Sequence, residues 1–406
     1  MNFPYFLAKR ITQAGERVYS KMIARVAIGT IATGIVVMIL AVAILNGFKS
    51  EIIGKQRGFL SDIQVTHYQK INSFESQPIS ITDTLLKNLK NYNFVEYAYP
   101  YITKPVILNT EGQVEGLVMK GVDEKFSQKF LHEHLIAGDT IGRDEEGIAL
   151  NDILLSEKIA NRLQLEVGSD FMIYFVQEPV RKRKLNVVGI YKTGVEELDN
   201  TYLIGSANLL RRINGWGDTQ FSGINIRVND FEDLMYQTNV IQNTLSTHWV
   251  AVNIKEQFME LFQWLDLLDA NPQIILALMM CVALINIISA LLIMILERTQ
   301  MIGLLKSMGM KNTKIRAVFL YLSMHLIGLG LLIGNAIAII FYFIQKKYQL
   351  IKLDEENYYM SFVPVQIGFL EVLLINLGVI IISLIVLIIP SLLITKIQPV
   401  KTLRFQ

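Results

Sequence analysis

Four stretches of the chain contain no Asp, Glu, Lys or Arg over a length sufficient to cross a lipid bilayer. About 20 apolar residues, each rising 1.5 Å, span a hydrocarbon core of about 30 Å. A buried helix of a soluble protein would give shorter runs that are interrupted by charge. The pattern therefore predicts four transmembrane helices. The charge-free windows are residues 26–48, 270–296, 317–345 and 372–395.

The composition agrees with this prediction, and the distribution of charge indicates which segments face the cytoplasm. Hydrophobic residues make up 52% of the chain and charged residues 18%, whereas a soluble domain carries about 25% charged residues. Residues 1–25, 297–316 and 396–406 are basic, while residues 49–269 and 346–371 carry an acidic excess. Short loops rich in Lys and Arg stay in the cytoplasm. Both termini and the loop 297–316 are thus predicted inside, and the large segment outside.

The predicted organisation follows from these boundaries. It comprises an amphipathic helix at 1–21, membrane helices at 22–48, 270–296, 317–345 and 372–395, a large outer domain with a stalk at 49–269, a loop at 346–371, and a tail at 396–406. The N-terminal helix carries Phe3, Phe6, Leu7, Ile11 and Ala14 at helical spacing. Such a helix is expected in the headgroup layer, unless it is an ordinary basic tail.

The outer domain is predicted to be α/β with two lobes. Strands at 59–67 and 94–109 flank a helix at 82–91, and strands at 222–228 and 249–253 flank a helix at 231–244. These pieces resemble two β-α-β units contributed by the two ends of the domain. Between them lies an inserted lobe at about 114–214, with helices at 152–163 and 206–213 and strands at 171–177 and 184–191. A helical stalk is predicted at 255–269.

The sequence contains none of three common nucleotide-binding or catalytic motifs. No phosphate-binding G-x-x-x-x-G-K-[ST] loop, H-E-x-x-H motif or G-x-S-x-G elbow occurs. The single cysteine, Cys281, falls within a predicted membrane helix, so the outer domain has no internal disulfide. The sequence predicts no enzyme, no metal or cofactor of its own, and no nucleic-acid partner, because the basic cluster of the outer domain faces away from the cytoplasm.

The predicted cytoplasmic loop 297–316 contains a short amphipathic helix. Its apolar positions are Met301, Leu304, Leu305 and Met308, and Gly309 follows as a C-cap. A helix of this kind suits docking into a groove of a partner protein. The alternative is a bare turn between two membrane helices, which would need only a few polar residues.

The stretch from Glu297 to Met310 resembles the E-I-G-[IVL]-L-[KR]-x-[LM]-G signature of the FtsX/MacB-type ABC permeases. Further similarities narrow the match to the LolC/LolE branch, the lipoprotein-releasing permeases. These are Phe6-Leu7-Ala8-Lys9-Arg10, Asn46-Gly47-Phe48, Tyr358-Tyr359 before Val363-Pro364-Val365, and Gln398-Pro399-Val400-Lys401-Thr402-Leu403-Arg404. The resemblance covers the whole chain, although the outer domain matches only in its layout.

The resemblance implies a role for several groups of residues. A separate LolD-like ATPase, which binds the ATP, would contact Glu297, Met301, Gly303, Leu304, Leu305, Lys306, Met308 and Gly309. A lateral lipid entrance would lie at Asn46, Gly47 and Phe48. A LolA-like periplasmic carrier would contact Pro179, Arg181, Lys182 and Arg183, although the connecting segment 177–184 is short for a projecting hairpin.

The resemblance also implies the bacterial inner membrane, lipoprotein cargo, contact with membrane lipid, and pairing with a second permease copy or a paralogue. Gly330, Gly334 and Ala338 form a small-residue seam suited to close helix packing. Two alternatives remain open. One is a MacB- or FtsX-like permease for efflux or for control of cell-wall hydrolases, and the other is a membrane receptor whose outer domain binds a ligand.

Overall fold

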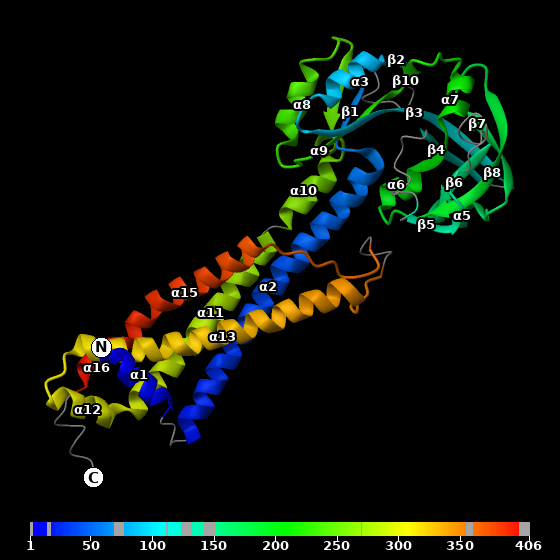
Figure 1. Ribbon diagram of the computed structural model, residues 1–406. Coiled ribbons are helices and arrows are strands. Elements are labelled where there is room, and N and C mark those ends of the chain that lie inside the picture. Colours follow the sequence, from blue (N-terminus) through cyan, green and yellow to red (C-terminus); the bar gives the residue numbers. More distant parts are fainter. Residues whose placement is uncertain are drawn as a thin grey trace. The chain divides into compact units, whose positions relative to one another are not determined.

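The computed structural model describes residues 3–13, 18–68, 77–110, 113–122, 132, 134–141, 151–268, 270–354 and 360–397. The chain divides into two compact units, each visible in Figure 1. The helical unit comprises Met1–Ser50, Trp264–Leu353 and Phe362–Gln406. The α/β unit comprises Glu51–Gln263 and Asp354–Ser361. Tyr358-Tyr359 and residues 398–404, which contributed to the resemblance, lie outside the described residues.

The helical unit contains the four predicted membrane helices. Its elements are α1 (Phe3–Gln13), α2 (Val18–Leu60), α10 (Met259–Leu267), α11 (Ala270–Glu297), α12 (Thr299–Ser307), α13 (Asn312–Tyr348), α15 (Phe369–Ser391) and α16 (Leu393–Lys396). Ala24–Leu60, Met259–Glu297, Asn312–Tyr348 and Phe369–Thr395 are long and apolar enough to cross a membrane. The prediction of four spans is confirmed, although α2 continues helically well past its charge-free window, through residues 49–60.

The small-residue seam of α13 lies against α2. A Cβ atom on Gly330 would come within 2.7 Å of the Ile31 side chain, and one on Gly334 within 2.8 Å of the Ala32 carbonyl. Ala338, one turn further, is fully buried. The missing side chains therefore let the two helices approach closely, which is the main source of packing energy between helices in lipid.

Two asparagine side chains inside the spans hydrogen-bond to each other. Asn335 of α13 and Asn376 of α15 exchange two amide hydrogen bonds, of 2.7 and 3.0 Å. Each amide nitrogen also donates to the carbonyl four residues earlier, that of Leu331 or Val372, at 2.7 Å. Since hydrocarbon offers no alternative partner, this pair joins α13 to α15 and specifies their register.

The N-terminal helix α1 packs on the helical unit. The Tyr5 ring meets the Tyr321 ring of α13 edge to face with centroids 5.8 Å apart, and Ala8 is buried in the same apolar cluster as the membrane helices. Phe6 remains exposed. Ala14, the last position of the predicted apolar stripe, lies outside the described residues.

One part of the α/β unit contains the two predicted β-α-β units, and they are interleaved; residues 59–60 of the strand predicted at 59–67 belong instead to α2. The first consists of β1 (Ile63–His67), α3 (Asp83–Lys90) and β3 (Val95–Thr110), and the second of β11 (Gly223–Val228), α8 (Leu234–Gln242) and β12 (Trp249–Asn253). The sheet order is β12-β1-β11-β3, and all neighbouring strands are antiparallel. Each unit thus encloses a strand of the other. The short strands β2 (Ile79–Ser80) and β10 (Gln220–Phe221) pair separately.

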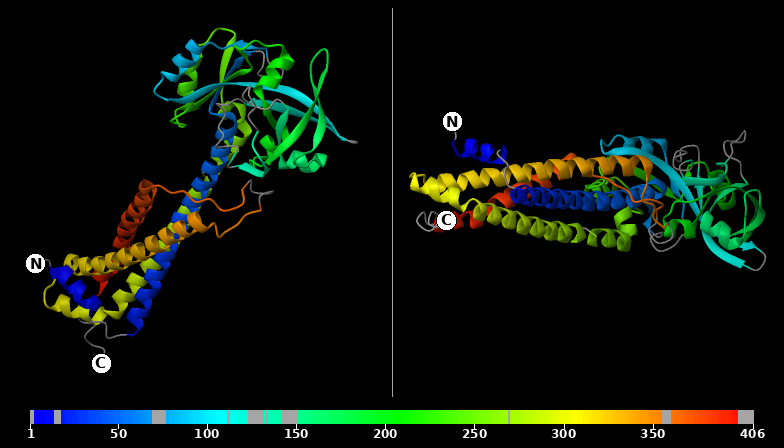
Figure 2. Two further views of the ribbon diagram at one scale, coloured as in Figure 1. Left: turned by 45° about the vertical axis from the view of Figure 1, so that its right-hand side comes forward. Right: turned by 90° about the horizontal axis from the view of Figure 1, so that it is seen from below.

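The inserted lobe is a closed ring of strands that the sequence did not predict. Its elements are β4 (Gln113–Val122), β5 (Leu135–Gly138), β6 (Asp152–Ser156), α5 (Glu157–Leu163), β7 (Asp170–Phe175), β8 (Arg181–Tyr191), α6 (Glu196–Thr201), β9 (Tyr202–Ser206) and α7 (Ala207–Asn214). Pairing runs β3-β4-β9-β6-β8-β7 and back to β3. The long strand β3 belongs to both parts of the sheet (Figure 2). Closure buries an apolar core from all six strands.

Two local predictions were wrong in part. The helix predicted at 152–163 begins only at Glu157, because residues 152–156 form the buried strand β6 and Ser156 caps α5 by accepting the Ile159 N–H. The predicted stalk is not one helix, since Phe258 interrupts it between α9 (Ile254–Gln257) and α10. Ser206 caps α7 by accepting the Leu209 N–H.

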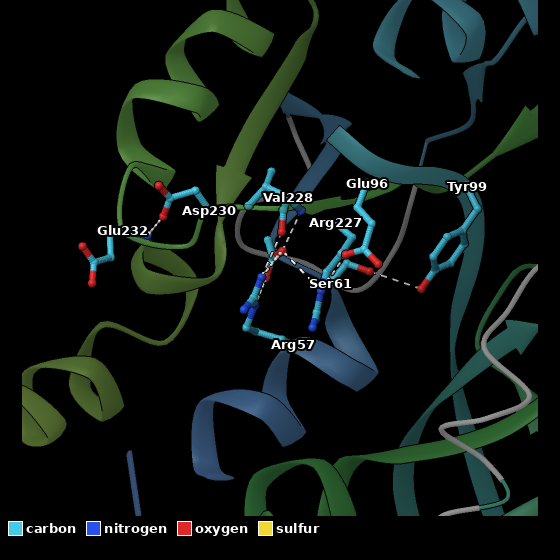
Figure 3. A network of polar contacts seen from close by, with 9 residues as sticks. Arg57, Ser61, Glu96, Tyr99, Arg227, Val228, Asp230 and Glu232 are labelled. Atoms are coloured by element: carbon cyan, nitrogen blue, oxygen red, sulfur yellow. Dashed lines mark hydrogen bonds and ion pairs between the residues drawn. The ribbon is translucent and has the colours of Figure 1, made fainter. Parts of the chain in front are cut away.

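A buried carboxylate anchors the C-terminal end of α2 in the α/β unit (Figure 3). Asp62 is fully buried and accepts from Arg57 Nε at 2.5 Å and Arg57 Nη2 at 2.9 Å, as well as from the Val228 backbone N–H at 2.7 Å. Arg227 Nε lies 3.6 Å away. Ser61 makes the sharp exit from the helix with φ 66°. Removing one partner of such a buried pair costs about 3–5 kcal/mol.

A buried lysine also meets this helix end. The Lys120 amino group of β4 donates to the carbonyl of Phe59, in the last turn of α2, and lies 4.3 Å from the Phe59 ring centroid. Carbonyls of a last helical turn have no partner within the helix, and they attract positive charge. Burial lowers the pKa of Lys120 from 10.5 to about 7.

The free energy of unfolding should therefore depend on Lys120 between pH 7 and pH 9. In this range the unfolded chain keeps the lysine proton that the folded chain has released, so stability rises with pH by up to about 1.4 kcal/mol per unit. The check is denaturant unfolding of the full-length protein in detergent at several pH values, with Lys120→Met as the comparison. A difference between the two proteins that stays flat from pH 7 to pH 9 would contradict the expectation.

Candidate functional site

The loop between the second and third apolar helices contains the short helix α12, as predicted. The chain bends at Arg298 between α11 and α12. At the other end, the Gly309 N–H donates to the Lys306 carbonyl and the Met310 N–H to the Leu305 carbonyl, both at 3.0 Å. Gly309 has φ +83°. This is a Schellman cap, so the predicted glycine C-cap is confirmed. The next helix, α13, begins at Asn312, after Lys311 at the N-cap.

The two faces of α12 have different partners. Leu304 and Met308, one turn apart, are 51% and 75% exposed. Ile302 and Gly303 are buried, and Met301 and Leu305 pack against the apolar core of the helical unit. The predicted four-residue stripe is therefore divided: Leu304 and Met308 form an outward apolar pair, whereas Met301 and Leu305 fasten the helix to its own unit.

Lys306 faces the protein. Its ammonium donates to the carbonyls of Ile394 at 2.6 Å, Ile397 at 2.8 Å and Thr395 at 3.3 Å, which lie at the C-terminal end of α16. Partial burial lowers the pKa of Lys306. The lysine was predicted to contact an ATPase together with Leu304, but the structure directs its three donors at carbonyls of its own chain.

Asn46, Gly47 and Phe48 of α2 each contact a different segment of the helical unit. Asn46 Nδ2 donates to Glu371 Oε1 of α15 at 2.8 Å. A Cβ atom on Gly47 would lie 2.5 Å from the Pro364 carbonyl oxygen, so only glycine allows the segment before α15 to lie there. The Phe48 ring meets the Trp264 ring of α10 at a centroid distance of 5.9 Å.

The basic hairpin is compact. β7 ends at Phe175 and β8 begins at Arg181, so the connection contains only residues 176–180, of which Pro179 is exposed. Arg181 Nη1 donates to the Ile213 carbonyl at 2.8 Å, at the end of α7. Lys182 is exposed and alternates to the opposite side of the strand.

Arg183, next along β8, is also exposed. Its guanidinium donates to the Lys182 carbonyl at 2.8 Å. All four predicted carrier contacts therefore lie at the surface, although the Arg181 guanidinium also donates to α7.

Sequence reasoning missed the partners of these residues. Glu371 lies just before a charge-free window. A carboxylate in the first turn of a helix is stabilised by the helix dipole, and Glu371 also accepts the Gly368 N–H at 2.8 Å. Trp264 left no comparable signal, because its contact with Phe48 joins distant segments. Among the described residues, no group of three or more His, Cys, Asp or Glu side chains could hold a metal ion.

Two family models cover most of the chain. The MacB-like periplasmic core domain matches residues 26–235, slightly more than half of the chain, and the FtsX-like permease C-terminal domain matches residues 273–399. The chain belongs to the MacB/FtsX-like permease family. Its α/β unit is thus the periplasmic core domain of a membrane permease, and the predicted resemblance is confirmed.

Individual relatives of this permease match along nearly their whole length. The lipoprotein-releasing system transmembrane protein LolC of Neisseria meningitidis is 24% identical, with 96% of this chain and 95% of that protein aligned. The corresponding LolE of Haemophilus influenzae is 22% identical, with 99% of each chain aligned. Among solved structures, the periplasmic region of MacB from Actinobacillus actinomycetemcomitans aligns with 48% of this chain and 91% of its own, at 13% identity and a TM-score of 0.33.

Because of the close approach at Gly47, we expect alanine substitutions at two glycines of α2 to differ sharply in their effect on stability. Gly47→Ala places a methyl group against the Pro364 backbone and should destabilise the permease by about 1–3 kcal/mol. Gly54→Ala meets nothing within 4 Å and should be neutral or stabilising, because alanine favours the helix by about 1 kcal/mol. Thermal unfolding in detergent measures both, and equal melting temperatures would refute the assignment.

Proposed function

We propose that this permease is the membrane subunit of an ABC transporter that extracts lipoproteins from the outer leaflet of the bacterial inner membrane. A separate LolD-like ATPase hydrolyses the ATP, and a LolA-like periplasmic carrier receives the lipoprotein. The observation that carries the proposal is the exposed pair Leu304 and Met308 on α12, in a chain that aligns with LolC and LolE from end to end.

The distribution of charge supports the orientation. Residues 297–316 hold five Lys or Arg and one Glu, and both terminal segments are basic as well. By the positive-inside rule this loop and both termini lie in the cytoplasm. The ATPase then reaches α12 from the side where ATP is available, and a groove on it receives Leu304 and Met308 as apolar anchors.

An external energy source is required by the hydrophobicity of the cargo. Each buried CH₂ contributes about 0.8 kcal/mol, so a triacylated anchor with some 45 methylenes is held by roughly 36 kcal/mol. Spontaneous release is negligible against that energy. The anchor must therefore pass into another apolar environment while the ATPase does work on the permease.

The proposed cycle uses the elements that flank α12. Closure of the ATPases displaces α12, and α11 and α13, which continue from its two ends, move with it. The cavity between two permease chains, lined by their first and second membrane helices, closes and expels the acyl chains. The segment Asn46–Phe48 lies beside the lateral entrance, and the exposed Pro179, Lys182 and Arg183 contribute to the contact with the carrier.

Replacing both exposed residues of α12, Leu304→Asp and Met308→Asp, should abolish association with the ATPase. Burying two carboxylates in an apolar groove is unfavourable, so co-purification of the ATPase with the tagged permease should fall at least about tenfold. Because both side chains project outward, the variant should fold normally.

The matched control is Met235→Asp, an equally exposed apolar position on α8 of the α/β unit. It should leave co-purification unchanged. If the ATPase co-purifies with the double variant as well as with the wild type, α12 is not the docking helix.

Depleting the permease in its native bacterium should strand lipoproteins in the inner membrane. Metabolic labelling with palmitate followed by density separation of inner and outer membranes measures this directly. Normal sorting of triacylated lipoproteins after depletion, with the ATPase still bound to the permease, would instead favour a MacB- or FtsX-like role in efflux or in hydrolase control.

A further inference from the structure

We propose that Lys306 is a positioning residue that links α12 to the end of the fourth membrane helix, so that α12 and α16 move together. The inference rests on the proposed function, because it is the ATPase that would displace α12. The observation behind it is the set of three hydrogen bonds from the Lys306 ammonium to the carbonyls of Ile394, Thr395 and Ile397.

The position of Lys306 on α12 separates it from the docking face. At 100° per residue, Leu304 and Met308 lie within about 40° of each other, and Lys306 lies about 160° or more from both. Gln300 and Ser307 are exposed on the same side as Leu304. An ATPase that binds this side leaves the contacts of Lys306 with α16 intact.

The chemistry of the contact fits a lysine. The last carbonyls of a helix have no intrahelical partner and carry the negative end of the helix dipole. An ammonium group offers three donors on a flexible stem, and here three carbonyls surround it. The Lys306 head is partly withdrawn from water, which strengthens its attraction to these carbonyls.

Neighbouring contacts reinforce the link. Arg316 Nε of α13 donates to Ser391 Oγ at 3.1 Å, one turn before α16. Ile302 of α12 and Ile394 of α16 are both fully buried in the same apolar cluster. The inner face of α12 and the end of the fourth helix therefore form one packed body.

Connectivity explains why such a link is needed. α12 is covalently continuous with α11 and α13, so its displacement reaches the second and third membrane helices through the backbone. The fourth helix, α15 with α16, joins the third only through the segment after Tyr348, at the opposite end of α13. Near α12 it can be moved only by noncovalent contacts, and Lys306 supplies three of them.

The first test measures the link itself, without the ATPase. Hydrogen exchange of the full-length permease in nanodiscs should show that the amides of 393–397 exchange at least about tenfold faster in Lys306→Met, because charged hydrogen bonds that restrain a helix end are lost. Lys306→Arg, which retains donors for the carbonyls, should stay near the wild type. Lys314→Met, which removes an exposed charge from the same loop, should have no effect. Unchanged exchange in α13 confirms that each variant is folded.

The second test measures transmission in the complex with the ATPase. Spin labels are placed at Thr299→Cys, which lies about 140° or more around α12 from Leu304 and Met308, and at the exposed position Leu393→Cys, in a Cys281→Ser background. In the wild type the distance between the labels should stay constant when a non-hydrolysable ATP analogue binds. In Lys306→Met the distribution should broaden and shift, while the ATPase co-purifies as before and lipoprotein release falls at least about tenfold.

The outcomes separate this inference from the proposed function. Unchanged hydrogen exchange in Lys306→Met overturns the link, and so does loss of ATPase co-purification, which would make Lys306 a docking residue. Normal lipoprotein release in Lys306→Met overturns its role in transmission. If no ATPase binds the wild type, the proposed function fails, and the exchange measurement still decides whether the link exists.

Discussion

The constraint on which the structure depends is that hydrocarbon offers no hydrogen bonds. A polar group inside the spans is costly unless it finds a partner within the protein. Thr30 and Thr33 donate to carbonyls of their own helix, and Asn335 and Asn376 pair with each other. With few polar groups to direct packing, glycines decide where helices come close, as Gly330 does against α2. For the proposed acylated cargo the constraint acts from the other side, because exposing its methylenes to water is unfavourable and its release therefore requires work.

The last carbonyls of a helix need partners outside the helix, and in three places a basic side chain provides them. Lys306 donates to the end of α16, Lys120 to the end of α2, and Arg181 to the end of α7. Each basic residue comes from a different element than the helix it caps. These contacts therefore do more than complete a helix: they fasten its end to a neighbour. In the α/β unit, Asp62 adds a second attachment at the end of α2.

Features set by local sequence were predictable, and features set by distant contacts were not. The spans follow from charge-free windows, and the interleaved sheet from strand and helix patterns at the two ends of the outer domain. The ring closed by β7 and β3 depends on pairing between distant strands, which no local pattern encodes. The strand β6 was assigned to a helix because its apolar run is also compatible with a buried helix. The short helix α12 was predicted from its apolar stripe, but its division into two faces was not.

That division limits what α12 can do. A stripe of four apolar residues suggests one surface, yet Met301 and Leu305 are occupied by the core of the helical unit, and Lys306 is turned toward α16. Two large side chains remain to enter a partner. In protein interfaces a few buried anchors carry most of the binding energy, and area alone does not set affinity. A helix that keeps half of its apolar residues for its own protein has less contact area for the proposed ATPase. In return, a force that the proposed ATPase applied to Leu304 and Met308 would act on a helix that is already attached to the membrane helices.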